Sequence, residues 1–384
     1  MKKLRHLLLS SLMLCLGNAI AAGAPEVGVS DNSISIGMTA PLSGPNGSYG
    51  VEMREVIEAS FRQINSSGGI HGRKLQLVAL DDGYETDRAV ANTRTLINEK
   101  KVFALLASYG SSPTTAAMNE VFGPAAVPLI GTISGADSLR QSPKENANSR
   151  YMFNVRTSYA NESEAIVKHL TALGLNNIAV FYQNDGFGKS GLDGVTAALK
   201  RRNLTPSAQG SVERNSLDVG KAAQAIARAN PQVVLMVTLY KPSAEFVRLM
   251  KKLGQNPQFF ALSPVGADLL VGELGAEARG IGIAQVMPYP WNDATPAVRE
   301  YQRLLSGDKK PTYYGIEAYL MSKTLLDGLR KSGRDLTREK LIASLESMQN
   351  HDLGGYRVSF SASDHSGSSF VDLTVIGSGG RVLH

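Results

Sequence analysis

The sequence predicts an α/β protein of two lobes, each a parallel sheet covered by helices. Two observations support this prediction. Short apolar runs alternate with segments of helical periodicity up to about residue 130, and the alternation restarts near residue 151, a pattern typical of successive strand–helix–strand units. In addition, no segment rich in proline, glycine and serine separates the two series. We therefore expect two domains between which the chain crosses on short strands.

The first series predicts four strands and three helices. Its first helix has apolar residues at near-helical spacing and stops before Gly68 and Gly69, a glycine signal for a helix end. The strands are expected at residues 33–38, 74–80, 102–107 and 127–130, and the helices at 51–64, 86–99 and 113–122.

The second series predicts a second lobe, and the C-terminal region returns to complete both lobes. Strands are expected at 151–155, 177–182, 233–237 and 259–262, and helices at 161–173, 188–201, 217–229 and 242–253. Three further helices (297–305, 315–331 and 338–347) and two strands (356–360 and 370–377) follow. We assign residues 32–152 and 288–353 to the first lobe, and residues 153–287 and 354–384 to the second.

The N-terminus is typical of a secretory signal peptide, which we place at residues 1–22. A short basic start precedes a mostly apolar stretch at 7–16, and small residues near Ala21 offer a cleavage site. A membrane-spanning helix needs about 20 apolar residues, and Gly17 interrupts this stretch too early. A leucine precedes Cys15, where a lipid-attachment site normally has a small residue. We therefore expect export without a lipid anchor.

The composition after removal of this signal argues against several classes of function. Cys15 is the only cysteine, so the mature protein is expected to have no disulfide and no cysteine-bound metal. The formal charge falls by three, from +6 to +3, without the basic residues of the signal. No basic cluster marks a nucleic-acid surface, and no two histidines have metal-ligand spacing. We predict no nucleic-acid partner, no metal site and no cofactor.

A serine-containing loop after the third strand is a candidate ligand site. In an open parallel sheet, ligands bind outside the carboxyl ends of the strands. This loop contains Tyr109, Ser111 and Ser112. Ser112 is a good helix N-cap, and Pro113 suits the first helical turn. Free N–H groups at such a helix start attract a carboxylate, although a capped helix start without a ligand explains the loop equally well.

The loop after the fourth strand is also small and hydroxylated. It carries Ile133, Ser134 and Gly135. Two such loops at one edge of a sheet favour a site for an anion or a zwitterion. Tyr49 follows the loop after the first strand and could form a wall of the same cleft. Its alternative is a surface tyrosine after a turn.

Aromatic residues follow two strands of the second lobe. Phe187 is expected at the start of the helix after strand 177–182, and Tyr240 follows strand 233–237. Opposite a first lobe lined by serine and glycine, these rings would cover an apolar side chain of a ligand. Taken singly, each ring is more often a packing residue.

The sequence contains no arrangement that predicts an enzyme. Residues 188–190 resemble the end of a phosphate-binding loop, but Gln183 replaces the glycine required five residues before Gly188. The G-x-S-x-G pattern of a nucleophile elbow is absent. The adjacent Asp81 and Asp82 would point to opposite faces of a strand. We therefore expect a binding protein without catalytic activity.

Taken together, these residues resemble the leucine/isoleucine/valine-binding proteins, the periplasmic binding proteins of the branched-chain amino acid ABC importers. The resemblance runs from about Ser33 to the C-terminus. Its motifs are Ala40-Pro41-Leu42-Ser43-Gly44-Pro45 with Tyr49-Gly50, Ile64-Asn65 with Gly68-Gly69-Ile70 and Gly72-Arg73-Lys74-Leu75, Asp81-Asp82, Gly110-Ser111-Ser112, Asn184-Asp185-Gly186-Phe187-Gly188, and Tyr240.

The resemblance implies a type I periplasmic binding fold, with two Rossmann-like lobes, three crossover strands and a small-molecule ligand clamped between the lobes. By matching to the family's motifs, Ser111 and backbone groups near Ile133 and Gly135 would hold an α-carboxylate. Phe187 and Tyr240 would close over the ligand from the other lobe. We expect a monomer in the periplasm that docks on an inner-membrane ABC permease.

Two departures from the family pattern leave the ligand open. Members usually have a threonine or serine near Gly135, and here Ser134 is adjacent to it. An acidic residue that pairs with the ligand's ammonium often follows the position of Pro264, and here Val265 follows it. We expect a small amino acid or a related apolar or aromatic carboxylate. A ligand sensor of the same fold and a secreted hydrolase are the alternatives.

Overall fold

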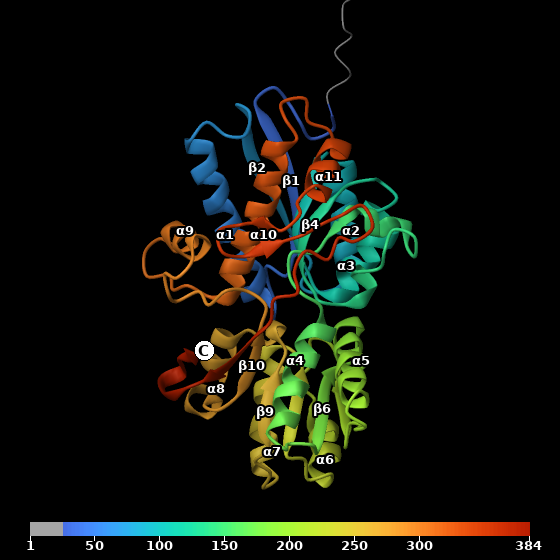
Figure 1. Ribbon diagram of the computed structural model, residues 1–384, viewed down its shortest axis with the longest axis vertical. Coiled ribbons are helices and arrows are strands. Elements are labelled where there is room, and N and C mark those ends of the chain that lie inside the picture. The colour runs from blue at the N-terminus through green and yellow to red at the C-terminus, as the bar shows by residue number, and fades with distance from the viewer. Residues whose placement is uncertain (1–25) are drawn as a thin grey trace, which may run out of the picture.

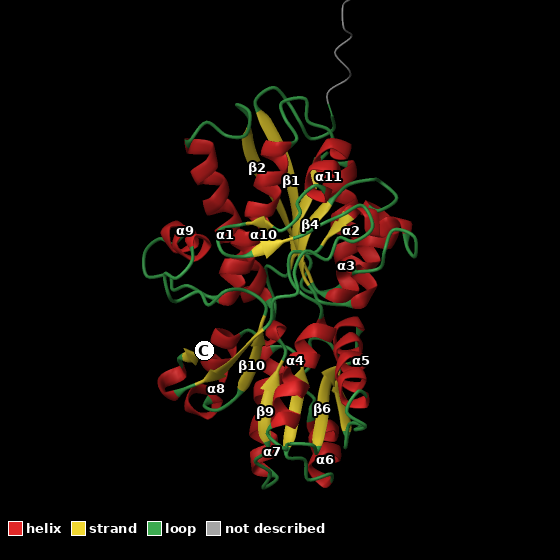
Figure 2. Cartoon of the chain, in the orientation of Figure 1, coloured by secondary structure: helices red, strands yellow, loops and turns green. Residues whose placement is uncertain are grey.

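The computed structural model describes residues 26–384, so the predicted signal peptide at 1–22 lies outside the described residues. Figures 1 and 2 show two lobes, each with strands at its centre and helices around them. The first strands of the chain lie in the upper lobe, called lobe 1. The C-terminus lies in the lower lobe, called lobe 2 (Figure 1). The predicted two-lobed α/β architecture is confirmed.

Lobe 1 is built on a five-stranded parallel sheet with the order β2-β1-β3-β4-β5. The central strands β3 and β4 are buried along their whole length, as expected for parallel strands covered on both faces. The strands are β1 (Ser33–Ala40), β2 (Lys74–Asp81), β3 (Ala104–Tyr109), β4 (Leu129–Ile133) and β5 (Met152–Phe153).

Helices from both ends of the chain cover this sheet. α1 (Gly47–Ser66) packs against α10 (Tyr313–Lys331), and α2 (Thr86–Asn98) packs against α3 (Ser111–Ala117). The segment predicted as one helix at 113–122 is α3 followed by a π-helical turn, η1 (Met118–Phe122). Lobe 1 also contains α9 (Pro296–Leu304), α11 (Arg338–Glu346) and the 3₁₀ segments η2 (Asp137–Leu139) and η3 (Ala147–Tyr151).

Lobe 2 contains a seven-stranded sheet with the order β14-β13-β10-β9-β8-β6-β7. Its first five strands along the chain are parallel, whereas β13 and β14 are added in antiparallel pairs. The chain re-enters this lobe from lobe 1, so β13 runs away from the cleft that the parallel strands approach. The strands are β6 (Ile178–Gln183), β7 (Gln209–Val212), β8 (Val233–Val237), β9 (Gln258–Ala261), β10 (Gly282–Gln285), β13 (Asp372–Ile376) and β14 (Val382–Leu383).

The lobe 2 sheet is covered by helices that follow its strands. The core beneath them includes Phe181 of β6 and Phe246 of α7, whose rings stack with centroids 4.0 Å apart. The helices are α4 (Tyr159–Ala172), α5 (Gly186–Lys200), α6 (Gly220–Arg228), α7 (Tyr240–Lys252) and α8 (Ala267–Leu274), with 3₁₀ segments η4 (Ser263–Val265), η5 (Gly275–Ala278) and η6 (Ser378–Gly380).

Three connections join the lobes, after β5, after β10 and before β13. Hydrogen bonds hold them side by side. The Tyr356 hydroxyl donates to the carbonyl of Val155 in the first connection at 2.9 Å and to that of Val286 in the second at 3.3 Å. Asn154 of the first connection forms a parallel bridge with Ser366 of the third. Hydrogen bonds therefore link the first connection to both of the others.

The segment from β11 to Phe360 helps to place the boundary between lobe 1 and lobe 2. β11 (His351–Asp352) pairs with β12 (Arg357–Val358), and the Phe360 ring packs against that of Phe153. The sequence analysis assigned residues from 354 onward to lobe 2. The pairing of β12 with β11 favours a boundary after Phe360, and we propose this position.

Four strands or α-helices of lobe 2 were not predicted from the sequence. They are β7, β10, β14 and α8. The sequence of β10, Gly-Ile-Ala-Gln, is too short to show periodicity, and it becomes a strand because β9 and β13 pair with it on either side. β7 alternates between exposed and partly buried residues at the sheet edge, where few apolar residues are needed.

Candidate ligand site between the lobes

A pair of buried serines marks the edge of the lobe 1 sheet that faces lobe 2. Ser111 begins α3, and Ser134 follows β4. Their Oγ atoms lie 2.8 Å apart, and both residues are almost completely buried. Burial raises the pKa of Tyr159, and the nearby Ser111 hydroxyl acts in the opposite direction. The two serines and Tyr159 thus form a hydroxyl cluster between the lobes.

Matched bends in two strands set the position of these loops. Ala107 in β3 and Gly131 in β4 both have positive φ, +55° and +73°. The two residues lie opposite each other, between the paired residues Leu106 and Ile130 on one side and Ser108 and Thr132 on the other. A Cβ atom at Gly131 would meet Met321 Cγ of α10 at 2.4 Å, so only glycine fits there. Both strands therefore change direction at one level, a few residues before Ser111 and Ser134.

Several tyrosine rings pack against one another between the lobes. Tyr49 is in contact with three of them: its ring centroid lies 5.3 Å from that of Tyr109, 4.6 Å from that of Tyr314 and 5.5 Å from that of Tyr240. Tyr84 packs edge-on against Tyr109 at 5.3 Å. Distances in this range favour aromatic pairing. These five residues, called the tyrosine cluster below, come from both lobes.

The cluster is bonded across the lobe boundary. From lobe 1, the Tyr49 hydroxyl donates to the Val265 carbonyl at 2.9 Å, and the Tyr314 hydroxyl donates to the Pro264 carbonyl at 2.9 Å. From lobe 2, the Tyr240 hydroxyl donates to the Pro45 carbonyl at 3.0 Å. The lobes are therefore closed on one another in this structure.

Hydrogen bonds of the Asn215 side chain, called the latch below, also join the two lobes. The Asn215 amide of lobe 2 donates to Glu85 Oε1 at 2.6 Å, and its carbonyl accepts from Asn46 Nδ2 at 2.7 Å. The neighbouring Arg214 donates to Thr86 Oγ1 at 2.8 Å. A cavity of about 160 Å³ lies beside the latch. It is lined by Pro45, Asn46, Gln183, Asn215, Ser216, Leu217, Leu239, Lys241 and Pro242.

A buried charge cluster lies behind the tyrosines, where the first connection enters lobe 2. Arg156 is 1% exposed and reaches both lobes. Its Nη2 lies 3.1 Å from Glu162 Oε1 of α4, and its Nη1 lies 3.4 Å from Glu317 Oε1 of α10. Arg156 also donates to Ser263 of lobe 2. One cation thus faces two carboxylates.

Burial dominates the titration of this cluster. Desolvation raises the pKa of Glu317 to about 7, although the Arg156 charge acts in the opposite direction. Desolvation also raises the pKa of Glu162, against the same arginine. The pKa of Arg156 itself rises because the two carboxylates outweigh its burial. The guanidinium is therefore charged at any physiological pH, whereas Glu317 titrates near neutrality.

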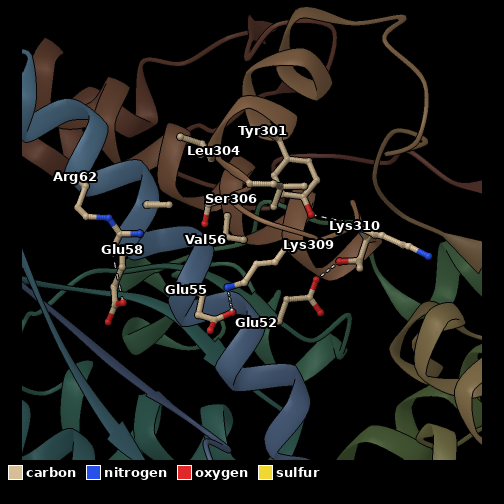
Figure 3. Close-up of a pocket in the computed structure, with 13 residues that line it drawn as sticks. Glu52, Glu55, Val56, Glu58, Arg62, Tyr301, Leu304, Ser306, Lys309 and Lys310 are labelled. Atoms are coloured by element: carbon tan, nitrogen blue, oxygen red, sulfur yellow. Dashed lines mark hydrogen bonds and ion pairs between the residues drawn. The ribbon is translucent and has the colours of Figure 1, made fainter.

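A second cavity lies within lobe 1, between α1 and the segment after α9 (Figure 3). Its volume is about 380 Å³, and apolar side chains such as Val56 and Leu304 form part of its wall. Three of its charged groups have partners on the wall: Lys309 Nζ lies 2.6 Å from Glu55 Oε2, and Glu52 accepts a hydrogen bond from Thr312. These three groups do not point to a ligand.

The sequence as a whole matches one family profile. Residues 33–381 fit the family described as periplasmic binding protein. The chain belongs to the periplasmic binding protein family. This is a family of solute-binding proteins, and the type I fold expected from the sequence is confirmed by solved structures of related proteins.

Three relatives illustrate the similarity. The Leu/Ile/Val-binding protein homolog 7 of Brucella abortus is 25% identical over 336 residues, which cover 82% of this chain and 81% of the relative. A structure titled a possible leucine/isoleucine/valine-binding protein, from Rhodopirellula baltica, has a TM-score of 0.85 and 30% identity, covering 94% of this chain and 98% of its own. A substrate-binding periplasmic protein from Ralstonia solanacearum also has a TM-score of 0.85 and 30% identity, covering 91% and 99%.

The binding-protein fold brings the nine residues selected from the sequence to one region. Seven of them belong to the serine pair, the tyrosine cluster or their immediate packing: Ser111, Ser134, Ile133, Phe187, Tyr49, Tyr109 and Tyr240. Gly135 joins the site through its carbonyl, which accepts from Tyr159 N at 2.8 Å. Ser112 has a different place: its Oγ accepts from Gly186 N of lobe 2 at 2.9 Å and links the lobes. Their role in ligand binding stays a prediction.

Several residues of this region were not predicted from the sequence. Tyr84 follows the second strand, so the rule that ligands bind at strand ends could have found it. Tyr314 and Glu317 lie on α10, far along the chain, and gave no signal in the sequence. Arg156 and Glu162 looked like ordinary charged residues around a helix start.

Other candidate groups have structural roles. Asp185 caps α5, accepting from Phe187 N and Gly188 N. Asp81 and Asp82 accept hydrogen bonds from separate partners, as their opposite directions on the strand predict. Among residues 26–384, no group of three or more metal-ligating side chains is gathered. No helix in the same range is long and apolar enough to cross a membrane.

Proposed function

We propose that this periplasmic binding protein is the extracytoplasmic receptor of an ABC importer and holds a small amino acid or related carboxylate between its lobes. The observation that carries this proposal is the Ser111–Ser134 hydroxyl pair, buried between the lobes at the sheet edge where Tyr109 of the tyrosine cluster also lies. Hydroxyl donors and adjacent backbone N–H groups can hold a carboxylate, and aromatic rings can cover its apolar part.

The bonds across the lobe boundary support a clamp mechanism. Tyr49, Tyr314 and Tyr240 each donate across the cleft in the closed form. A ligand that contacts both lobes binds the closed form better than an open one and therefore shifts the population towards it. Closure removes water from the ligand and strengthens its hydrogen bonds. The closed form would then be the one that a membrane permease recognises.

Binding fits the Ser111 environment better than catalysis does. The nearest partner of its Oγ is another hydroxyl, that of Ser134, which is not a general base. We therefore retain the expectation of a periplasmic monomer without enzymatic activity. A sensor of the same fold is the second candidate. Stimulation of the ATPase of the partner permease by the loaded protein would distinguish import from sensing.

Ligand binding should raise the thermal stability of the mature protein, and loss of the hydroxyl pair should remove most of this effect. A ligand at 100 times its Kd adds about 2.7 kcal/mol. A buried hydrogen bond to a charged group contributes about 1.5–3 kcal/mol, so Ser111→Ala and Ser134→Ala should each weaken binding by about 10–100-fold. The measurement is a thermal-shift screen of amino acids, aromatic acids, urea and amides, followed by calorimetry.

Ser163→Ala is the matched control for these variants. Ser163 is a fully buried serine in α4 of lobe 2 whose Oγ has no hydrogen-bond partner among the described residues. Its loss should leave the affinity unchanged. Unaltered affinity in both Ser111→Ala and Ser134→Ala would contradict the proposed site. Turnover of an ester or amide that Ser111→Ala abolishes would instead favour the hydrolase.

Removal of the Asn215 latch should weaken ligand binding without unfolding the protein. Asn215 has a φ of +58°, so we choose Asn215→Gly, which keeps this backbone conformation and deletes the interlobe hydrogen bonds of the side chain. Each exposed bond is worth about 1 kcal/mol or less, so Kd should rise by about 3–10-fold, mainly through faster release. Stopped-flow dissociation of a bound ligand measures this effect.

The control for the latch is Asn203→Gly. Asn203 has the same φ of +58° but follows α5 on the surface of lobe 2. Both variants should change the free energy of unfolding similarly, and only Asn215→Gly should alter ligand release. Equal release rates in the two variants would show that the latch does not contribute to closure.

A further inference from the structure

We propose that the site selects an aromatic carboxylate and rejects its α-amino acid counterpart. This inference rests on the proposed function, because it names the class of ligand that the interlobe site would take. It follows from three features of the described residues: the site offers hydrogen-bond donors, its nearby acceptors are already engaged, and its walls are aromatic rings.

The polar groups of the site are hydroxyls, which can donate to a carboxylate. Ser111, Ser134 and Tyr159 supply hydroxyls, and the Tyr109 hydroxyl is buried without a hydrogen bond of normal geometry to any described residue. Burial raises the pKa of the Tyr109 phenol well above its usual value, so the proton stays on the oxygen. An unpartnered buried donor is costly unless a ligand supplies an acceptor.

The carbonyl acceptors of the site are already engaged. The carbonyls of Pro264 and Val265 face lobe 1 at the beginning of the α8 region, where they could accept from an ammonium group. They accept instead from Tyr314 and Tyr49. Val265 itself is fully buried and adds no charge. An incoming ammonium group would have to share these carbonyls with two buried tyrosine hydroxyls.

The carboxylates nearest to the site are also engaged. Glu162 pairs with Arg156 and accepts from the Ser263 backbone N at 2.7 Å. Asp185 caps α5 and pairs with Arg214 at 3.1 Å. Asp268 makes no side-chain hydrogen bond or ion pair with a described residue, but its charge acts on Glu52 and Tyr301, which line the separate cavity of Figure 3.

Glu317 is the carboxylate of the buried charge cluster that keeps spare hydrogen-bonding capacity. Its Oε1 makes no hydrogen bond of good geometry but lies 3.4 Å from the Arg156 guanidinium. Arg156 has a second contact with Glu162, so an ammonium group at Glu317 would approach a buried cation as well. Glu317 is therefore a poor partner for an ammonium group. The variant Glu317→Gln tests whether it binds one.

The walls of the site suit a flat ring. The tyrosine cluster presents rings in stacked and edge-on orientations, with centroids 4.6–5.5 Å apart along its closest pairs. Phe187 adds a further ring next to Tyr159, 5.1 Å away. An aromatic ligand gains from such pairing beyond its buried area, whereas an aliphatic chain gains only the area.

The test uses two matched pairs of acids that differ only by the α-ammonium group. They are 3-phenylpropionate with L-phenylalanine, and 4-methylpentanoate with L-leucine; 3-phenylpropionamide serves as the uncharged probe. Titration calorimetry on the mature protein should show 3-phenylpropionate binding at least about 100-fold more tightly than L-phenylalanine, because an unpaired buried ammonium is strongly rejected. It should also bind about tenfold more tightly than 4-methylpentanoate, and the amide should bind weakly.

The outcomes separate this inference from the proposed function. If an amino acid binds as tightly as its deaminated twin, the ligand class is wrong, and loss of that binding in Glu317→Gln would identify the ammonium partner. If no member of either pair binds, the aromatic-acid assignment is also wrong. If urea or the amide alone binds, the carboxylate site and the proposed function both fail.

A second variant tests the donor assignment independently. Tyr109→Phe removes only the unpartnered hydroxyl. The unfolding free energy of the free protein should stay the same or rise, while the affinity for 3-phenylpropionate should fall by about tenfold. An unchanged affinity would show that this hydroxyl does not face the ligand and would contradict the donor-lined site.

Discussion

Replacing Arg156 with methionine should destabilise the protein by about 3–5 kcal/mol, because removal of one partner leaves buried charges without compensation. Within residues 26–384, the ion pairs of Glu162 and Glu317 are both made with Arg156, and all three side chains are at most 6% exposed. Methionine retains much of the volume, so the loss is electrostatic and not a cavity effect. Equilibrium urea denaturation measures the change.

An exposed arginine pair provides the control. Arg150 donates to both oxygens of Glu339, at 3.0 and 2.7 Å, but both side chains are largely exposed. Arg150→Met should cost less than about 1 kcal/mol. Adding Glu317→Gln to Arg156→Met should recover part of the stability, since one uncompensated carboxylate is removed. If Arg156→Met cost no more than Arg150→Met, the buried cluster would not hold the lobes together.

The protein should be more stable near pH 5 than near pH 8. The pKa of Glu317 is raised to about 7 by burial, against an ordinary value of 4.5. Between these values the folded protein binds more protons than the unfolded chain, so stability falls as the pH rises. Burial also raises the pKa of Asp82 to about 6 and that of Glu52 to about 7, which adds in the same direction. The expected loss from Glu317 is on the order of 2 kcal/mol.

At lower pH a different group reverses the trend. Hydrogen bonds from Ser43, Leu42 and Gly83 lower the pKa of Asp81 to about 2, so its contribution is present above pH 4 and is lost as the pH falls towards 2. We therefore expect a stability maximum near pH 5. Chemical denaturation at a series of pH values measures the curve.

Glu317→Gln isolates the contribution of the charge cluster to this curve. Glutamine resembles the protonated carboxyl, so the variant should match the original protein near pH 5 and exceed its stability near pH 8. Glu120→Gln, at an exposed carboxylate in η1, is the control and should leave the curve unchanged. A curve that keeps its full slope in Glu317→Gln would assign the titration to other groups.

The loops at the strand ends were predictable from sequence, because their chemistry is local. Ser111 and Ser134 each follow a buried apolar strand, and carboxyl ends of neighbouring parallel strands meet at one sheet edge. Tyr240 and Phe187 follow strands of lobe 2 in the same way. The strand–helix alternation that placed these residues also predicted the two lobes, because its periodicity depends only on neighbouring residues.

The contacts across the cleft were decided by the tertiary structure. Glu317 and Tyr314 lie on a late helix, and they reach the site because the chain returns to lobe 1 after building most of lobe 2. Arg156 becomes a buried partner of Glu162 and Glu317 only where two lobes and a connection meet. The sequence by itself determined the fold and the donor loops through local periodicity. The tertiary structure alone decided which charged side chains are desolvated and which partners they have, because these side chains are buried between segments that are distant in the chain.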